Sequence, residues 1–84
     1  MYRVILERQV TKDLARLLPK IVGQIIRKAE SLAENPRPQD SKRVISQPGE
    51  LRVDSGEYRI FYEVDDTERI ARILRVRNRR EAYR

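Results

Sequence analysis

The chain has 84 residues, of which 39% are hydrophobic and 38% are charged, so it can form one domain with a single small core. It contains no cysteine and no histidine, which excludes a disulfide framework, a thiolate zinc site and the serine–histidine catalytic triads. Any catalysis would therefore depend on arginine, lysine, tyrosine or carboxylate side chains, and neither a metal ion nor another cofactor is expected.

The positive charge is concentrated at the C-terminus. Residues 1–68 contain 12 basic and 12 acidic side chains, whereas residues 69–84 contain seven arginines and one glutamate, a net charge of +6. Such a segment favours a polyanionic partner, because guanidinium groups bind phosphate through two hydrogen bonds and stack on bases. Binding to a membrane surface is a weaker alternative, since the segment alternates like a strand and not like an amphipathic helix.

The sequence predicts a soluble, cytoplasmic protein without contact with a membrane. No apolar run reaches the roughly 20 residues that span a bilayer, and residues 1–8 lack the apolar region of a signal peptide. No internal repeat or linker interrupts the chain, so residues 1–84 are expected to form one domain.

The first part of the chain predicts one short strand and two helices. Residues 2–6 alternate as a strand at or next to a sheet edge. Thr11 is the expected cap of the first helix, with Asp13 in its first turn, and Pro19 either ends this helix or begins the next one. Residues 20–34 have apolar side chains at helical spacing and form the second helix.

Residues 36–49 are predicted to form a loop, because proline, serine and glycine recur in them. Lys42 and Arg43 make a basic pair in this loop, which either binds nucleic acid or is ordinary solvated charge. A DNA-reading helix-turn-helix is excluded for the two preceding helices, since no exposed face of the second helix is richer in basic residues than Arg27 and Lys28.

The clearest local pattern is a β-hairpin over residues 50–64, in which alternating apolar residues flank an Asp-Ser-Gly turn. Gly56 is the turn position that accepts a positive φ angle without steric cost. The predicted core face of the second strand consists of Tyr58, Ile60, Tyr62 and Val64.

Arg59 belongs to the opposite face of this strand, where its guanidinium can bind a phosphate. The alternative is an ion pair across the sheet with Glu50, Asp54 or Glu63. Both readings place Arg59 away from the helices, because successive strand residues point to opposite faces.

A third strand, residues 69–77, is predicted to alternate without interruption. The order β-α-α-β-β-β then gives an α+β fold, with an antiparallel sheet and a two-helix hairpin packed on one face. The other face stays partly open, and Arg59, Arg75 and Arg77 are expected to converge on it.

Arginines from the strands and the C-terminal tail would thus lie within the width of one sheet. They repel one another unless an anion is bound, which favours a ligand-binding role. A tyrosine near the end of the tail can stack on an unstacked RNA base. The predicted nucleic-acid-binding residues are Lys42, Arg43, Arg75, Arg77, Arg80 and Arg84.

Two segments, residues 51–64 and 73–84, resemble the RelE/ParE toxin superfamily, and more closely its RelE branch. The first contains the hairpin pattern R-x-x-x-G-x-Y-R-x-x-Y, and the second contains R-R-E-x-Y. Chain length, element order and the proline-rich loop fit the same group. The resemblance implies a RelE-like microbial RNase fold and a toxin of a type II toxin–antitoxin pair.

RelE-type toxins enter the ribosomal A site and cleave mRNA, with the 2′-hydroxyl attacking the adjacent phosphate. The resemblance therefore implies a ribosome-dependent mRNA endonuclease whose partners are the ribosome, mRNA and a cognate antitoxin. The positions that match the catalytic residues of the family are Arg52, Arg59, Arg79 or Arg80, and Tyr83.

The chain departs from RelE-type sequences at two places. Glu50 stands where many relatives have a second basic residue, and Arg77-Asn78 stand where many have Gly-His. Because arginine stays protonated and tyrosine titrates near pH 10, charge stabilisation and positioning are expected to outweigh general-base catalysis.

The ParE branch implies a different function, a non-enzymatic inhibitor of DNA gyrase. Such a toxin needs neither Tyr83 nor converging arginines. A nucleic-acid-binding module without catalysis is the third possibility. For either kind of toxin the expected partner is a small, partly disordered, acidic-tailed antitoxin.

Overall fold

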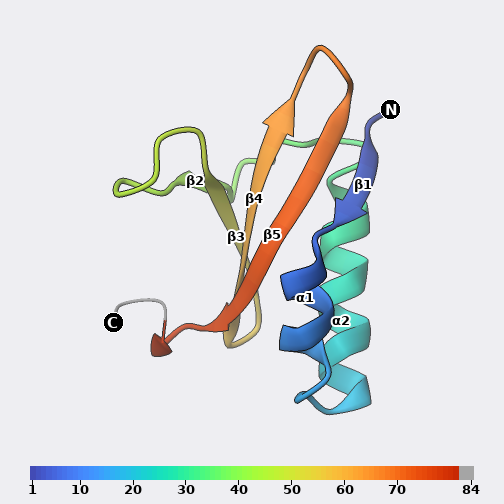
Figure 1. Ribbon diagram of the computed structural model, residues 1–84, viewed down its shortest axis with the longest axis vertical. Helices are drawn as coiled ribbons and strands as arrows, with labels where there is room; N and C mark the ends of the chain where they lie inside the picture. Colours follow the sequence, from blue (N-terminus) through green and yellow to red (C-terminus); the bar gives the residue numbers. More distant parts are fainter. Residues whose placement is uncertain (82–84) are drawn as a thin grey trace.

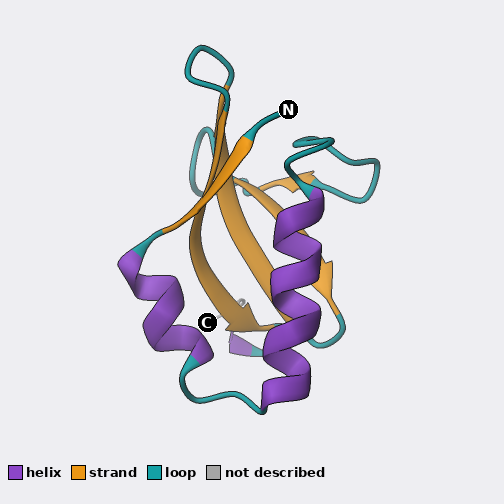
Figure 2. Cartoon of the chain, turned by 90° about the vertical axis from the view of Figure 1, so that its right-hand side faces the viewer, coloured by secondary structure: helices purple, strands orange, loops and turns teal. Residues whose placement is uncertain are grey.

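A computed structural model describes residues 1–81 and forms a five-stranded mixed sheet with two helices on one face (Figures 1 and 2). The helices are α1 (Arg8–Leu14) and α2 (Pro19–Ser31). The strands are β1 (Arg3–Leu6), β2 (Lys42–Arg43), β3 (Leu51–Ser55), β4 (Tyr58–Asp65) and β5 (Ile70–Asn78). Their order in the sheet is β1-β5-β4-β3-β2. The predicted α+β fold, with a two-helix layer on one side of the sheet, is confirmed.

The two outer strands differ in detail from the prediction. β1 lies at an edge as expected, but it runs parallel to β5, with Arg3 opposite Ile70. β2 lies in the segment predicted as a loop and pairs antiparallel with β3, with Lys42 opposite Arg52. Strand direction cannot be read from alternation, because both kinds of ladder have the same period of two. Two residues are also too few to show any period.

α1 begins earlier than the sequence predicted. Its first residue is Arg8, after an extended Glu7, so Thr11 is not the cap and Asp13 lies near the C-terminal end of the helix. Asp13 is buried and bonds to the sheet, and this tertiary contact replaces the expected role at a helix N-terminus. α2 begins at Pro19, where the fixed φ angle of proline suits the first helical turn.

The core lies between α2 and the centre of the sheet. Tyr62 is fully buried, and its hydroxyl donates a hydrogen bond to the Pro36 carbonyl at 2.7 Å. Burial raises the pKa of this phenol. The predicted core face of β4 is confirmed, since Tyr62 and Ile60 are central and Tyr58 and Val64 pack at the margin. No helix within residues 1–81 is long and apolar enough to cross a membrane.

β5 does not alternate regularly, so the prediction of an uninterrupted pattern is wrong. Between the partners of Phe61 and Tyr62, β5 has one extra residue, Leu74, which makes a β-bulge. Ala71 and Val76 consequently both reach the core, although uniform alternation would place them on opposite faces.

β3 and β4 form the predicted hairpin. Gly56 in its turn has a φ angle of 58°, in the left-handed region that glycine adopts without steric cost. The hairpin register places Asp54 opposite Arg59 and Arg52 opposite Phe61. The two strands thereby hold cationic side chains at defined positions on the face away from the helices.

Candidate nucleic-acid interface

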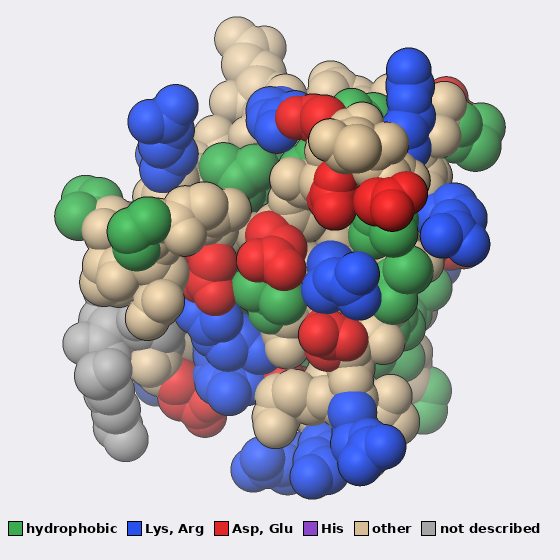
Figure 3. Space-filling view, turned by 45° about the horizontal axis from the view of Figure 1, so that its top comes forward, with side chains coloured by type: hydrophobic (Ala, Val, Ile, Leu, Met, Phe, Trp, Pro, Cys, Tyr) green, Lys and Arg blue, Asp and Glu red, His purple; other side chains and the backbone are tan. Residues whose placement is uncertain are grey.

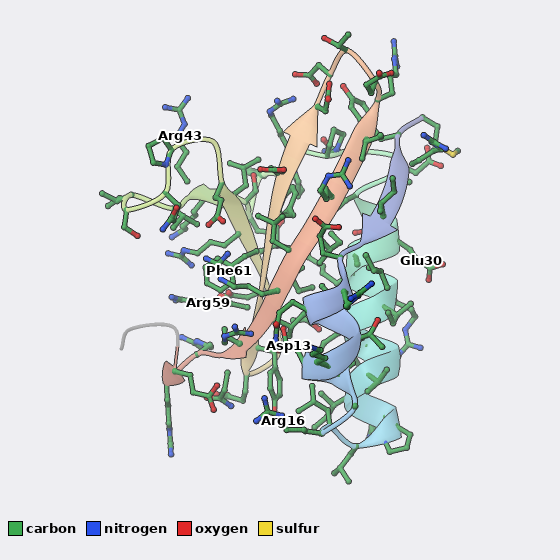
Figure 4. All side chains as sticks on the ribbon, in the orientation of Figure 1. Asp13, Arg16, Glu30, Arg43, Arg59 and Phe61 are labelled. Carbon is green, nitrogen blue, oxygen red and sulfur yellow. The ribbon has the colours of Figure 1, made fainter. Side chains whose placement is uncertain are left out.

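The open face of the sheet carries a row of cationic side chains around one aromatic ring. Across β2, β3, β4 and β5 the register aligns Lys42, Arg52, Phe61 and Arg75. Residues opposite one another on neighbouring strands lie about 5 Å apart and share a face, so these four form one row, here called the central row. Figure 4 shows Phe61 and Arg59 projecting from the sheet on the side away from α1 and α2.

Arg75 lies over the ring of Phe61. Its guanidinium carbon is 4.3 Å from the ring centroid, which is the geometry of a cation–π contact. The two Nη atoms donate hydrogen bonds to the carboxylate of Glu50 at 2.9 and 3.0 Å. The Glu50 hydrogen bonds raise the pKa of Arg75. Arg75 is therefore held between an aromatic ring and a carboxylate.

Arg59 lies on the open face but is only 6% exposed. Its Nε is 3.3 Å from Oδ1 of Asp54, the cross-strand partner. This is one of the ion pairs that the sequence left open as an alternative to phosphate binding. A phosphate at Arg59 would therefore compete with the Asp54 carboxylate for the guanidinium.

Arg77 is held at the edge of β5 against α1. Its Nη1 donates to Oδ2 of Asp13 at 2.9 Å. The same carboxylate accepts hydrogen bonds from the backbone N–H of Val76 and from the side chain of Gln9, both at 2.9 Å. In the register of β4 and β5, Arg77 lies opposite Arg59, so the two share the open face as expected. The Arg77 guanidinium, however, is bound to Asp13 of α1 and not to a residue of the central row.

The basic residues of β2 point in different directions. Lys42 is exposed and belongs to the central row, whereas Arg43 pairs with Leu51, a residue that packs against the core. Arg43 therefore lies away from the central row. Arg43 lines a depression beside the loop of residues 44–49.

The C-terminal tail continues from β5 past the end of the hairpin. The backbone N–H of Arg79 donates to the Glu57 carbonyl at 2.8 Å, and that of Arg80 donates to the Asn78 side chain at 3.0 Å. Both arginine side chains are exposed. Two further predicted site residues, Tyr83 and Arg84, lie outside the described residues.

Carboxylates neutralise three of the predicted site arginines. Arg59, Arg75 and Arg77 each have an internal acidic partner, and Figure 3 shows acidic side chains directly against basic ones on the visible surface. Five predicted site residues have no ion pair within residues 1–81 and are partly or fully exposed: Lys42, Arg43, Arg52, Arg79 and Arg80. Arg43 lies away from the central row, so the other four carry the positive charge available on the open face and in the tail.

The sequence reasoning assigned no site role to Phe61 or Glu50. The sequence did contain a signal for Phe61, because an aromatic residue on the polar face of an alternating strand cannot pack into the core and is available for another role. Glu50 was considered only as a possible ion-pair partner of Arg59 and as a departure from related sequences. Its diagonal contact with Arg75 depends on the register of three strands, which no local pattern contains.

A family model described as the ParE toxin of a type II toxin–antitoxin system, parDE, matches residues 4–83. A comparison with curated proteins found no match.

Solved structures of similar fold are toxin–antitoxin proteins. A chain of the RelBE2 toxin–antitoxin complex from Mycobacterium tuberculosis is 28% identical, with a TM-score of 0.81 over 92% of this chain and 96% of that one. A chain of the archaeal RelE–RelB complex from Pyrococcus horikoshii OT3 is 25% identical, with a TM-score of 0.80 over 93% and 94%. The isolated RelE toxin of E. coli, 21% identical, shares the fold with a TM-score of 0.77 over 99% and 96%. The chain therefore belongs to the ParE toxin family of type II toxin–antitoxin systems, within the RelE/ParE superfamily.

Proposed function

We propose that this toxin is a ribosome-dependent endonuclease that cleaves mRNA in the A site and thereby inhibits translation. The observation that carries the proposal is the open sheet face, where the neighbouring strands β3 and β4 hold Arg52 and Arg59 at diagonal positions of the same face. The similarity to chains of two RelE–RelB-type complexes at 28% and 25% identity supports a RelE-like activity.

The chemistry suits a site without histidine. The 2′-hydroxyl oxygen attacks the adjacent phosphorus while the bond to the 5′-oxygen breaks, and negative charge builds up on the phosphorane. Arg52, Arg59 and Arg79 would stabilise this charge, and Tyr83 would stack on the base and orient the hydroxyl. Placement of mRNA by the ribosome supplies the geometry, so positioning carries much of the rate.

A cognate antitoxin holds such a toxin inactive in growing cells. Two of the solved relatives are chains of complexes named as toxin–antitoxin or RelE–RelB assemblies. The excess of arginine in residues 69–84 favours an antitoxin segment that is acidic. We expect the toxin to co-purify with the small acidic product of an adjacent gene.

Primer extension on a defined mRNA in stalled ribosomes tests the activity. The expected result is a cut within the A-site codon that requires both toxin and ribosomes, with none on the same RNA in solution. Arg52→Ala should lower the cleavage rate by at least about 100-fold, because it removes a charge that stabilises the transition state. Arg59→Ala and Arg79→Ala should act alike.

Arg27→Ala is the matched control, because Arg27 is an exposed arginine on α2, away from the sheet. It should leave cleavage unchanged. Circular dichroism must show that Arg59→Ala still folds, since Arg59 is buried. Full cleavage by Arg52→Ala and Arg59→Ala would overturn the site assignment.

Inhibition of DNA gyrase is the second candidate, favoured by the match to the ParE family model. It predicts cleaved DNA bound to gyrase and intact mRNA in intoxicated cells. Growth inhibition that persists in the Arg52→Ala and Arg79→Ala variants would favour this function over RNA cleavage.

A further inference from the structure

Phe61 occupies an unusual position for an aromatic side chain. It lies on the face of β4 away from the helices and is not part of the hydrophobic core cluster. It is nevertheless only 6% exposed. The guanidinium of Arg75, stacked at 4.3 Å, lies over the ring and helps to exclude water from it.

The position of Arg75 depends on an acidic partner at the surface. Glu50, immediately before β3, accepts both Nη hydrogen bonds of Arg75, at 2.9 and 3.0 Å. A phosphate presents to guanidinium the same pair of oxygen atoms as a carboxylate does. An RNA phosphate can therefore replace Glu50 as the partner of Arg75, and it also repels the Glu50 carboxylate.

The neighbours of Phe61 suit a nucleic acid strand. Arg52 on β3 and Arg75 on β5 flank the ring on two sides in the central row, two strand spacings or roughly 10 Å apart. Lys42 extends the row by one further strand. Cationic side chains on both sides of an aromatic ring are typical of surfaces that bind single-stranded nucleic acid.

We propose that Phe61 is a covered stacking platform for a base of single-stranded RNA, and that the Glu50–Arg75 pair is a cover that the RNA opens. The side chains of Arg75 and Glu50 are only 28% and 12% exposed, so separating them costs more than separating a surface ion pair, and the incoming phosphate and the stacked base together offset this cost. The cover therefore stays closed in water and opens when a phosphate and a base arrive together. This site rests on the RNA-cleaving function proposed above and adds a second aromatic contact to that of Tyr83.

Phe61→Trp gives a direct test, because the chain contains no tryptophan. The introduced indole is then the sole tryptophan fluorophore. The probes are a 2′-O-methylated RNA pentamer, which cannot be cleaved through its 2′-oxygen, and a polyphosphate of equal charge without bases. The RNA should quench the emission by roughly half through stacking, and the polyphosphate should bind without comparable quenching.

Glu50→Gln tests the cover. This substitution removes the charge that holds Arg75, and we expect RNA affinity to increase about two- to fivefold. Glu63→Gln is the matched control, since Glu63 is an exposed carboxylate on the same face and lies 4.0 Å from Arg72 instead. It should raise the affinity less than Glu50→Gln does.

Three results would overturn the platform: equal quenching by RNA and polyphosphate, RNA that leaves the emission unchanged, or equal effects of the two glutamine variants. If Phe61→Trp does not fold, Phe61→Leu replaces it, with loss of RNA affinity but not of polyphosphate affinity as the expected result. Quenching without A-site cleavage would overturn only the endonuclease function. If the Phe61→Trp variant cleaves mRNA in the A site but its tryptophan fluorescence does not change when RNA is added, only the stacking platform is overturned.

Discussion

At the residue scale, the Asp13 side chain accepts a backbone hydrogen bond of β5 that a neighbouring strand would otherwise accept. β1 ends at Leu6, opposite Ile73, so the backbone N–H of Val76 lies beyond the last residue that β1 can pair. The Asp13 carboxylate accepts this N–H at 2.9 Å and also binds Arg77 and Gln9. A buried N–H without an acceptor is costly, so one side chain fastens α1 to the edge of β5.

Replacing Asp13 by alanine should lower the free energy of unfolding by about 1.5 to 3 kcal/mol, because buried donors lose a charged acceptor. Urea denaturation followed by circular dichroism measures this change. Asp40→Ala is the control, since it breaks the exposed Asp40–Lys28 pair, which contributes at most about 1 kcal/mol. Equal losses in the two variants would show that Asp13 has only a surface role.

At the element scale, Asp66 connects three segments that are distant in the sequence. It lies in the turn between β4 and β5, accepts a hydrogen bond from the Tyr2 hydroxyl at 2.5 Å and binds Arg37 of the proline-rich loop through two hydrogen bonds of 3.0 and 2.9 Å. Chiefly the Arg37 hydrogen bonds, together with that of Tyr2, lower the pKa of Asp66 to about 2.

This pKa predicts an acid-sensitive contribution to stability. An aspartate in the unfolded chain titrates near 3.9, so the charged Asp66 stabilises the fold above about pH 4 and loses this effect as the pH falls towards 2. The difference in unfolding free energy between the native chain and Asp66→Asn should therefore shrink over this interval. Denaturant titrations at a series of pH values measure it.

Asp65→Asn is a suitable comparison for this titration, because Asp65 is adjacent in the chain but accepts only the Glu68 backbone N–H within residues 1–81. The difference in unfolding free energy between the native chain and Asp65→Asn should change less between pH 4 and 2. A difference for Asp66→Asn that stays constant from pH 5 to 2 would contradict the assigned pKa.

At the scale of the whole molecule, the number of arginines in the predicted site overstates the charge available to a ligand. Three arginines of the predicted site are paired with carboxylates of the same chain. Because Glu50 already neutralises Arg75, a phosphate that takes the place of Glu50 at this arginine releases few counterions. Apart from Arg43, which lies away from the central row, the described site residues that remain for phosphate contacts are Lys42, Arg52, Arg79 and Arg80.

The salt dependence of RNA binding should reflect this smaller set. With about 0.7 counterions released per phosphate of a single strand, four contacts give a slope of log affinity against log salt of about −3. Fluorescence anisotropy of a labelled RNA at several KCl concentrations measures the slope. A slope of about −5 or steeper would mean that the paired arginines also release counterions.

The sequence alone determined the elements that depend on local patterns. The hairpin, the positive φ angle at Gly56 and the placement of Arg59 opposite the core face of β4 all follow from alternation and turn chemistry. These features are predictable because each depends on residues close together in the chain. For Pro19 the sequence left two readings open, and the structure shows that it begins α2.

Only the tertiary structure decided how the elements meet. The parallel pairing of β1, the strand at Lys42–Arg43 and the bulge at Leu74 depend on neighbours that are distant in the sequence. So do the two contacts that change the candidate site, Glu50 with Arg75 over Phe61 and Asp13 with Arg77. Periodicity records which face of a strand is buried, but ion pairs across a sheet depend on register and direction, which are set when strands from different parts of the chain pack together.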